Sequence, residues 1–189
     1  MIRIFEGRAI HQAPNLRDSM FRDRSAQFID RHGWEITRDE TGREIDQYDP
    51  LDPIYVIACD GDRHLGSLRL LPTTGRTLLA EHFAHLAPDG FARRGLMECT
   101  RFCIAPGAPS NVSTDLFRET FRLGLARGWD GALGIFDARM MRVYKRIGIA
   151  PKLISRDGED RHAICLGEWT FSRQGLDRLS PRNTLPLAA

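Results

Sequence analysis

An arginine stands in the middle of an otherwise apolar helical stripe near the start of the chain. The stripe consists of positions spaced by four, which share one face of a helix: Leu16, Met20, Arg24 and Phe28. Arg24 therefore occupies a position where a core residue is expected. A buried guanidinium needs an anion or several hydrogen-bond acceptors. The alternative is a side chain whose aliphatic stem carries the charge to the surface.

Candidate anions follow in a polar segment, residues 37–53, where Asp46 and Asp49 are three positions apart. Such aspartates often stabilise turns, and the other interpretation is a carboxylate cluster that faces a cation. A calcium loop is disfavoured, because its glycine and its closing glutamate are missing. Phe28 and Trp34 flank the end of the helix. Each is typical of core packing, and each can also contact a cationic ligand.

Charged side chains also interrupt two apolar strands. Arg69 lies within Leu65–Leu71, and Glu98 and Arg101 lie within Leu96–Ile104. In a regular strand, positions three apart point to opposite faces. Glu98 and Arg101 can therefore serve one pocket only if the strand bulges. An ion-pair network between neighbouring strands is the structural interpretation, and it is compatible with a binding site.

Basic residues dominate part of the second half of the chain. Arg139, Arg142 and Arg146 fall on one face of a predicted helix, with Arg118 and Lys152 at its margin. Such a face is commonly a solvated surface. The alternative is a docking surface for an acidic partner.

Periodicity and turn residues predict the elements that position these side chains. Strands are predicted at residues 1–6, 54–59, 65–71, 96–104, 132–136, 151–155 and 162–169. Helices are predicted at residues 14–31, 78–86, 112–127 and 139–147. This order predicts an α/β fold, with a mixed, mostly antiparallel sheet flanked by helices on both faces. We expect one domain over residues 1–180 and a loosely ordered tail at residues 181–189.

Composition excludes several classes of protein. The chain has 189 residues and a net charge of +2, which makes no electrostatic case for nucleic acid. No apolar run approaches the length of a membrane span, and the first residues lack a signal-peptide core. The four cysteines form no Cys-x-x-Cys pair and the histidines form no His-x-x-x-His pair, so neither disulfides nor a metal site are expected. These features predict a cytoplasmic protein with no membrane partner.

In order and spacing, the charged and aromatic set resembles the acyl-homoserine lactone synthases, which make bacterial quorum-sensing signals. The matching positions are Arg24, Phe28, Trp34, Asp46, Asp49, Arg69, Glu98 and Arg101, with Phe83 in Glu-His-Phe-Ala as a further match. Residues 138–149 also look like the last helix and turn of the Gcn5-related N-acetyltransferases. Both resemblances imply the same acyltransferase-like α/β/α sandwich.

The resemblance implies an acyltransferase with two substrates and no resident cofactor or metal. Members join the amine of S-adenosylmethionine to an acyl group carried on acyl carrier protein or coenzyme A. They then close the lactone and release methylthioadenosine. The implied catalytic residues are Glu98, Arg69 and Arg101, with Glu98 as the base. The implied substrate-binding residues are Arg24, Phe28, Trp34, Asp46, Asp49, Phe83 and Asp137.

Two further expectations depend on the resemblance. Asp137 stands where many members have Ser or Thr in contact with an oxygen on the third acyl carbon, which puts selectivity for 3-oxo chains in doubt. Acyl carrier proteins are acidic, so the expected docking surface is the basic face of Arg139, Arg142 and Arg146, together with Lys152.

Two other functions are compatible with the same fold. One is an N-acetyltransferase that acts on a small amine with acetyl coenzyme A, but the Gly-rich pyrophosphate-binding turn is missing before Val112. The other is a non-catalytic binding protein. An inactive relative would have little use for the intact charged set, which argues against it.

Overall fold

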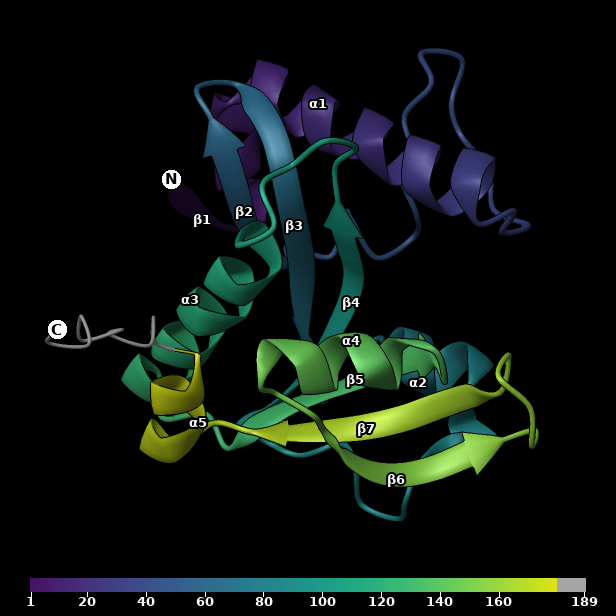
Figure 1. Ribbon diagram of the computed structural model, residues 1–189. Helices are drawn as coiled ribbons and strands as arrows, with labels where there is room; N and C mark the ends of the chain where they lie inside the picture. Colours follow the sequence, from purple (N-terminus) through teal and green to yellow (C-terminus); the bar gives the residue numbers. More distant parts are fainter. Residues whose placement is uncertain (180–189) are drawn as a thin grey trace, which may run out of the picture.

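The computed structural model describes residues 1–179, in which seven strands form one sheet (Figure 1). Their order across the sheet is β1-β2-β3-β4-β5-β7-β6. The strands are β1 (Ile2–Glu6), β2 (Ile54–Asp60), β3 (Arg63–Pro72), β4 (Leu96–Ile104), β5 (Gly131–Asp137), β6 (Lys152–Asp157) and β7 (Ile164–Thr170). Within these residues only β4 and β5 pair in parallel, which confirms a mixed, mostly antiparallel sheet.

Helices lie on both faces of the sheet, as predicted. They are α1 (Pro14–Ser25), its π-helical continuation η2 (Ala26–Arg31), α2 (Leu78–His82), α3 (Val112–Ala126), α4 (Met140–Ile147) and α5 (Arg173–Arg178), with 3-10 turns η1 (Gly7–Gln12) and η3 (Ala84–Leu86). The sequence pattern does not predict η1 or α5, because six residues are too few to show a helical stripe. Within the described part of the chain, no helix is long and apolar enough to cross a membrane. The tail predicted at residues 181–189 lies outside the described residues.

Strand alternation divides the core between the two faces of the sheet. Tyr55 and Ile57 of β2 pack with Leu16 of α1 on one face. Val56 and Ala58 point the other way and pack beneath α3. The α1 face is therefore the one that receives the helical stripe with its central arginine.

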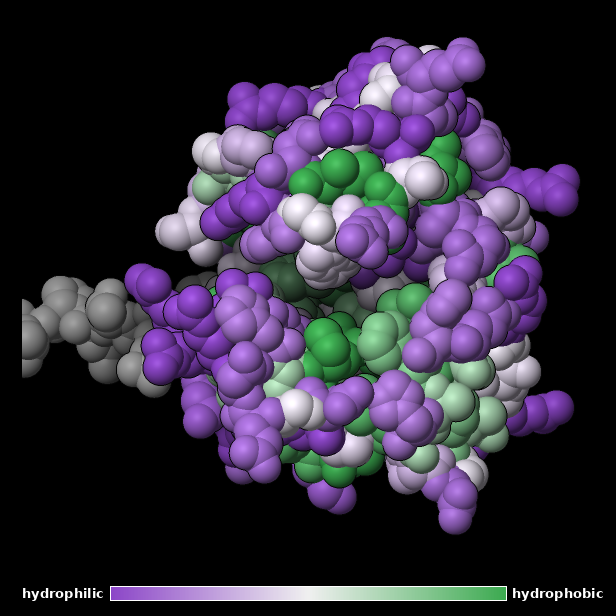
Figure 2. Space-filling view, turned by 90° about the vertical axis from the view of Figure 1, so that its right-hand side faces the viewer, coloured by the Kyte–Doolittle hydropathy of each residue, from purple (hydrophilic) through white to green (hydrophobic). Residues whose placement is uncertain are grey.

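The sheet opens between β4 and β5. Their pairing joins Leu96–Glu98 to Gly131–Leu133, and beyond it the two strands diverge (Figure 1). Figure 2 shows the corresponding side of the molecule hollowed across its middle, with hydrophobic side chains in and below the hollow. This cleft lies between η2 with the following loop and the half of the sheet formed by β5, β6 and β7.

A bulge interrupts the pairing of β3 with β4. Ser67 pairs with Cys103 and Arg69 pairs with Thr100, so β4 has one residue more than β3 over this stretch. Arg101 and Phe102 are the two β4 residues between these pairs. Arg101 has a φ angle of 52°, in the left-handed region that non-glycine residues rarely adopt. The bulge required by the sequence argument is therefore present at Arg101.

Candidate active site

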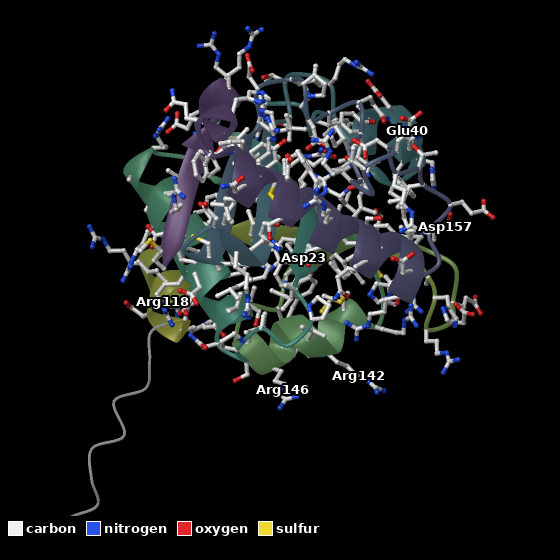
Figure 3. The ribbon with its side chains drawn as sticks, turned by 90° about the horizontal axis from the view of Figure 1, so that it is seen from above. Asp23, Glu40, Arg118, Arg142, Arg146 and Asp157 are labelled. Carbon is white, nitrogen blue, oxygen red and sulfur yellow. The ribbon has the colours of Figure 1, made fainter. Side chains whose placement is uncertain are left out.

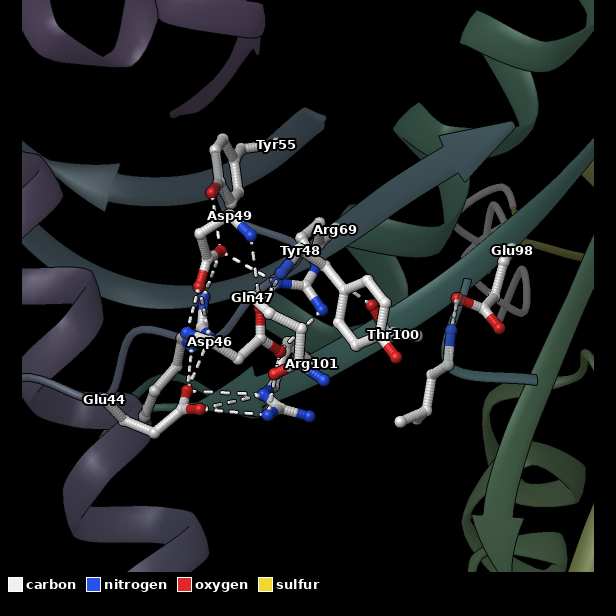
Figure 4. A network of polar contacts seen from close by, with 12 residues as sticks. Glu44, Asp46, Gln47, Tyr48, Asp49, Tyr55, Arg69, Glu98, Thr100 and Arg101 are labelled. Carbon is white, nitrogen blue, oxygen red and sulfur yellow. Dashed lines mark hydrogen bonds and ion pairs between the residues drawn. The ribbon is translucent and has the colours of Figure 1, made fainter. Parts of the chain in front are cut away.

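A buried network of arginines and carboxylates joins α1, the loop before β2, and β3 (Figure 4). Arg24 donates to Glu44 at 2.5 Å and to both oxygens of Asp49 at 2.9 and 3.0 Å. Arg69 donates to both oxygens of Asp46 at 2.5 and 2.9 Å, and to Asp49 at 2.9 Å. Each arginine is 1% exposed. The anions that a buried Arg24 requires are therefore provided by this network, and the surface alternative for Arg24 is wrong.

Asp49 is the centre of the network, because it binds both arginines and also accepts a 2.6 Å hydrogen bond from the Tyr55 hydroxyl. Burial alone would raise the pKa of Asp49. The guanidinium groups of Arg24 and Arg69 more than offset this and hold that pKa well below its usual range. Burial, followed by the Asp49 charge, raises the pKa of Tyr55 far above its usual value. At neutral pH, Asp49 is therefore a fixed anion between two fixed cations.

Arg101 and Asp46 form the edge of the network that is nearest to solvent. The Arg101 guanidinium lies 2.9 Å from Glu44 and 2.9 Å from Asp46. The side chains of Arg101 and Asp46 are each 9% exposed, against 1% for Arg24 and Arg69. A ligand in the cleft can therefore reach Asp46 and Arg101, whereas the two buried arginines act through the carboxylates that they hold.

Two stacked aromatic rings lie beside Arg101. The ring centroids of Phe28 and Trp34 are 4.7 Å apart and their planes are inclined by 6°. The Arg101 guanidinium is 5.7 Å from the Phe28 centroid. Phe28 is buried, as core packing predicts, but Trp34 is 48% exposed and is therefore not a core residue. Its open face is suited to contact a cation.

Glu98 lies on the same face of the sheet as Arg69 but apart from the network (Figure 4). Its two carboxylate oxygens accept the backbone N–H groups of Leu78 and Leu79, at 3.0 and 2.7 Å, where α2 begins. Burial raises the pKa of Glu98, although these N–H groups and Arg69 partly oppose the shift. Each carboxylate oxygen has a second lone pair, so Glu98 can still accept a hydrogen bond from a ligand or a water.

Apolar side chains lie on both sides of the gap between β4 and β5. On the α2 face, Phe83 packs in a cluster with Leu133 and Ile135 of β5. On the opposite face, Phe102 of β4 and Phe136 of β5 belong to the main core. Apolar side chains on both faces of the sheet therefore adjoin the place where β4 and β5 diverge.

The end of β5 and the start of α4 differ in part from the sequence expectation. Asp137 accepts hydrogen bonds from the backbone and side chain of Arg139 at 2.8–2.9 Å, so the two charges neutralise each other. Arg142 and Arg146 point away from α4 into solvent (Figure 3), and neither forms an ion pair within residues 1–179. Lys152 is also exposed. Of the four predicted docking residues, Arg139 is therefore already paired with Asp137, whereas Arg142, Arg146 and Lys152 are exposed.

Three residues complete the site although the sequence pattern does not single them out. Glu44 is 1% exposed and bridges the arginines of α1 and β4. Tyr55 is directly opposite Arg69 in the β2–β3 register. Thr100 accepts a 3.1 Å hydrogen bond from the Nε of Arg69. A glutamate in a polar loop resembles any exposed residue, and only its spacing of two from Asp46 signals that it faces inward.

The edge of the cleft can bind a molecule that carries charges of both signs. Asp46 supplies an anion, Arg101 a cation and Trp34 an aromatic face. Together they complement an amine, a carboxylate and a further positive charge. Glu98 adds a buried carboxylate with a raised pKa, which is the property expected of a proton acceptor.

The chain is similar to proteins of one family along most of its length. Residues 9–166 match the family model described as autoinducer synthase. An acyl-homoserine-lactone synthase from Rhizobium etli is 36% identical over 179 residues, which covers 89% of this chain and 84% of that protein. A solved structure of a CoA-dependent acyl-homoserine lactone synthase with MTA has a TM-score of 0.84 and 24% identity, covering 95% of this chain and 87% of that one. A putative N-acetyltransferase from Lactobacillus plantarum has a TM-score of 0.59 and 15% identity, covering 90% of this chain and 99% of that one.

Proposed function

We propose that the two substrates of this chain meet in the cleft beside the arginine–carboxylate network. The chain belongs to the autoinducer synthase family, and it is an acyltransferase that makes an acyl-homoserine lactone. One observation carries this placement: Asp46 and Arg101 are paired at the edge of the cleft, next to the open ring of Trp34. An N-acetyltransferase acting on a simple amine would have no use for a cation and an aromatic face at the same edge.

S-adenosylmethionine has one group for each member of this edge. Its amine meets Asp46, its carboxylate meets Arg101, and its sulfonium faces the stacked pair of Phe28 and Trp34. Arg24 and Arg69 do not touch the substrate in this arrangement. They are positioning residues, which hold the carboxylates in place.

Acylation requires a neutral amine and a polarised thioester. Glu98, directly or through a water, takes the proton from the substrate amine as the amine nitrogen attacks the thioester carbonyl. Backbone N–H groups of β4 at the bulge stabilise the developing oxyanion. The carbon–sulfur bond of the thioester then breaks and the carrier leaves as a thiolate. A thiolate is a good leaving group, so no nucleophilic side chain is needed.

Lactonisation follows within the acylated substrate. A carboxylate oxygen attacks the γ-carbon, the bond from that carbon to the sulfonium sulfur breaks, and methylthioadenosine leaves as a neutral thioether. The protein contributes mainly by folding the substrate into this geometry. Neither step needs a resident cofactor or metal. The proposed compartment is the cytoplasm, which is consistent with four free cysteines.

Purified protein is expected to convert S-adenosylmethionine and an acyl thioester, of either acyl carrier protein or coenzyme A, into an N-acyl lactone, methylthioadenosine and a free thiol in equal amounts. Mass spectrometry of the reaction mixture measures all three products. Release of thiol without lactone, with acetyl coenzyme A and a different amine, would instead support the N-acetyltransferase.

The exposed cations of α4 are expected to steer an acidic acyl carrier protein to the cleft. Reversing the charges of Arg142 and Arg146 together should raise the Michaelis constant for a carrier-borne substrate and leave S-adenosylmethionine binding unchanged. Each exposed pair contributes only about 0.2–1 kcal/mol, so the defect should be a slower encounter that shrinks in high salt. Steady-state kinetics at two ionic strengths measure this.

A matched control reverses the same amount of charge at Arg22 and Arg63, which are exposed on α1 and at the start of β3. This control should leave carrier kinetics unchanged. If the α4 variant also behaves like wild type at low salt, α4 is only a solvated face, and coenzyme A becomes the favoured acyl donor.

A further inference from the structure

A buried line of polar groups under α1 has no role in the steps proposed above. It consists of Asp23, His64 and Ser67, which we call the β3 anchor. The Nδ1 atom of His64 lies 2.7 Å from a carboxylate oxygen of Asp23, and its Nε2 atom lies 3.0 Å from the Ser67 hydroxyl. His64 and Ser67 are 1% and 2% exposed, whereas the side chain of Asp23 on α1 is 26% exposed (Figure 3). The β3 anchor therefore runs from the surface into the sheet.

The order of these groups is that of a nucleophilic serine site, in which an aspartate orients a histidine that activates a serine. A nucleophile must contact its substrate, and a hydroxyl that is 2% exposed is closed to a dissolved molecule. Within residues 1–179, no buried side-chain nitrogen or oxygen lacks a hydrogen-bond partner. A buried polar network that is fully satisfied makes one arrangement of the backbone rigid. The β3 anchor is therefore suited to hold structure in place.

The β3 anchor itself depends on a bulge in β3. The pairing of β3 with β2 shifts at Leu65, because the partners of His64 and Gly66 are consecutive residues of β2. Positions 64 and 67 of a regular strand would point to opposite faces. Here both intervening residues face α3: Leu65 packs against the main core, and a Cβ at Gly66 would lie 2.7 Å from Val112. The bulge thus brings the His64 ring and the Ser67 hydroxyl together under α1.

Ser67 also borders the second bulge, the one that contains Arg101. Ser67 pairs with Cys103 at one end of this bulge, and Arg69 pairs with Thr100 at the other. Arg69 is held by its ion pairs with the network, and Ser67 is held by the β3 anchor. The positive φ angle of Arg101 costs energy and persists only where the surrounding structure enforces it. The network and the β3 anchor therefore hold the bulge from its two ends.

We propose that the three residues of the β3 anchor are positioning residues for acylation. They fix one end of the β4 bulge, and thereby the backbone N–H groups that meet the thioester oxyanion. The side chain of Arg101 depends on them less, since two carboxylates of the network hold it independently. The effect on the reaction rate rests on the proposed function, whereas the effect on the bulge does not.

The variant Ser67→Ala removes the hydroxyl that borders the bulge. Its single-turnover rate of acylation should fall about tenfold, since a small displacement of positioned groups slows a reaction markedly. Its affinity for S-adenosylmethionine, measured by calorimetric titration, should stay within about twofold of wild type, because the lost interaction acts mainly in the transition state. Amide hydrogen exchange of β4, measured without substrate, should become faster at residues 101–103.

The matched control is Ile10→Val, which removes one methylene from the buried cluster under α1. It weakens packing on the same face of the sheet without touching β4. All variants are compared at a temperature at which circular dichroism shows them to be folded. Ile10→Val should keep the wild-type rate and the wild-type exchange at residues 101–103. Ser67→Ala with the same rate and exchange as Ile10→Val would overturn the proposal.

Two variants of Asp23 distinguish positioning from proton transfer. An asparagine can still hydrogen-bond to His64, and the Ser67 hydroxyl can donate or accept, so either tautomer of the ring completes the link. Asp23→Asn should therefore keep a rate near that of wild type. Asp23→Ala, at a partly exposed position, should lower the rate in the same direction as Ser67→Ala.

Equally slow Asn and Ala variants of Asp23 would refute positioning, because they would show that the carboxylate charge is required. If Ser67→Ala does not fold, this pair of variants decides the matter. A wild-type protein that makes no lactone would refute only the proposed function, since hydrogen exchange at the bulge needs no substrate.

Discussion

Replacing Glu44 with glutamine is expected to lower the free energy of unfolding by about 3–5 kcal/mol, the usual cost of removing one partner from a buried ion pair. Glu44 is 1% exposed and accepts hydrogen bonds from Arg24 and Arg101. Glutamine keeps the shape but leaves two guanidinium groups without their shared anion. Because Arg101 is then held by Asp46 alone, its position is less fixed and the affinity for S-adenosylmethionine should also fall. Chemical denaturation and calorimetric titration measure the two effects.

Glu40 provides the matched control. It lies four residues earlier in the same loop and is exposed at the surface (Figure 3). Glu40→Gln should change stability by less than about 0.5 kcal/mol, as surface substitutions usually do. If Glu44→Gln proves as stable as Glu40→Gln, the network is not a supporting element of the site.

Replacing Glu98 with glutamine is expected to lower the rate of acylation about 100- to 10,000-fold, the range for loss of a general base. Burial raises the pKa of Glu98, and a base works only when deprotonated. The wild-type rate should therefore fall as pH decreases through that raised pKa, and this acid limb should be absent from the variant. Single-turnover rates measured across pH report both effects.

The Glu98 variant also disturbs α2, since a glutamine has only one oxygen for the two N–H groups of Leu78 and Leu79. Thr77→Ala separates the two roles. Thr77 caps the same helix by accepting from the Ala80 N–H at 3.2 Å, and its loss should cost about 1 kcal/mol of stability. Thr77→Ala should keep most of the turnover. If it loses as much as Glu98→Gln, Glu98 positions α2 and is not the base.

Much of the fold and part of the site could be predicted from sequence because each rests on a local rule. Period-two and helical patterns locate the strands and long helices. Three apolar neighbours on one helical face make a buried position one of two possibilities for Arg24, and for a buried Arg24 the need for anions follows from the cost of burying a charge. The bulge at Arg101 follows from strand geometry once Glu98 and Arg101 are assigned to one face.

The rest depends on tertiary contacts that no local rule contains. The inward orientation of Glu44 and the Tyr55 hydrogen bond to Asp49 follow from how the loop before β2 packs on the sheet. Spacing alone also does not distinguish a residue that contacts ligand from one that holds its neighbour. Arg24 and Arg139 look like binding residues in sequence, yet Arg24 is enclosed by carboxylates and Arg139 is paired with Asp137.

A crystal structure of the protein with S-adenosylmethionine tests the central claim most directly. We expect the substrate carboxylate on Arg101, its amine on Asp46, and its sulfonium within about 6 Å of the Phe28 or Trp34 ring. Arg24 and Arg69 should keep their contacts with the network carboxylates. A substrate bound elsewhere, or one whose carboxylate displaces Glu44 or Asp49 from Arg24, would contradict the account.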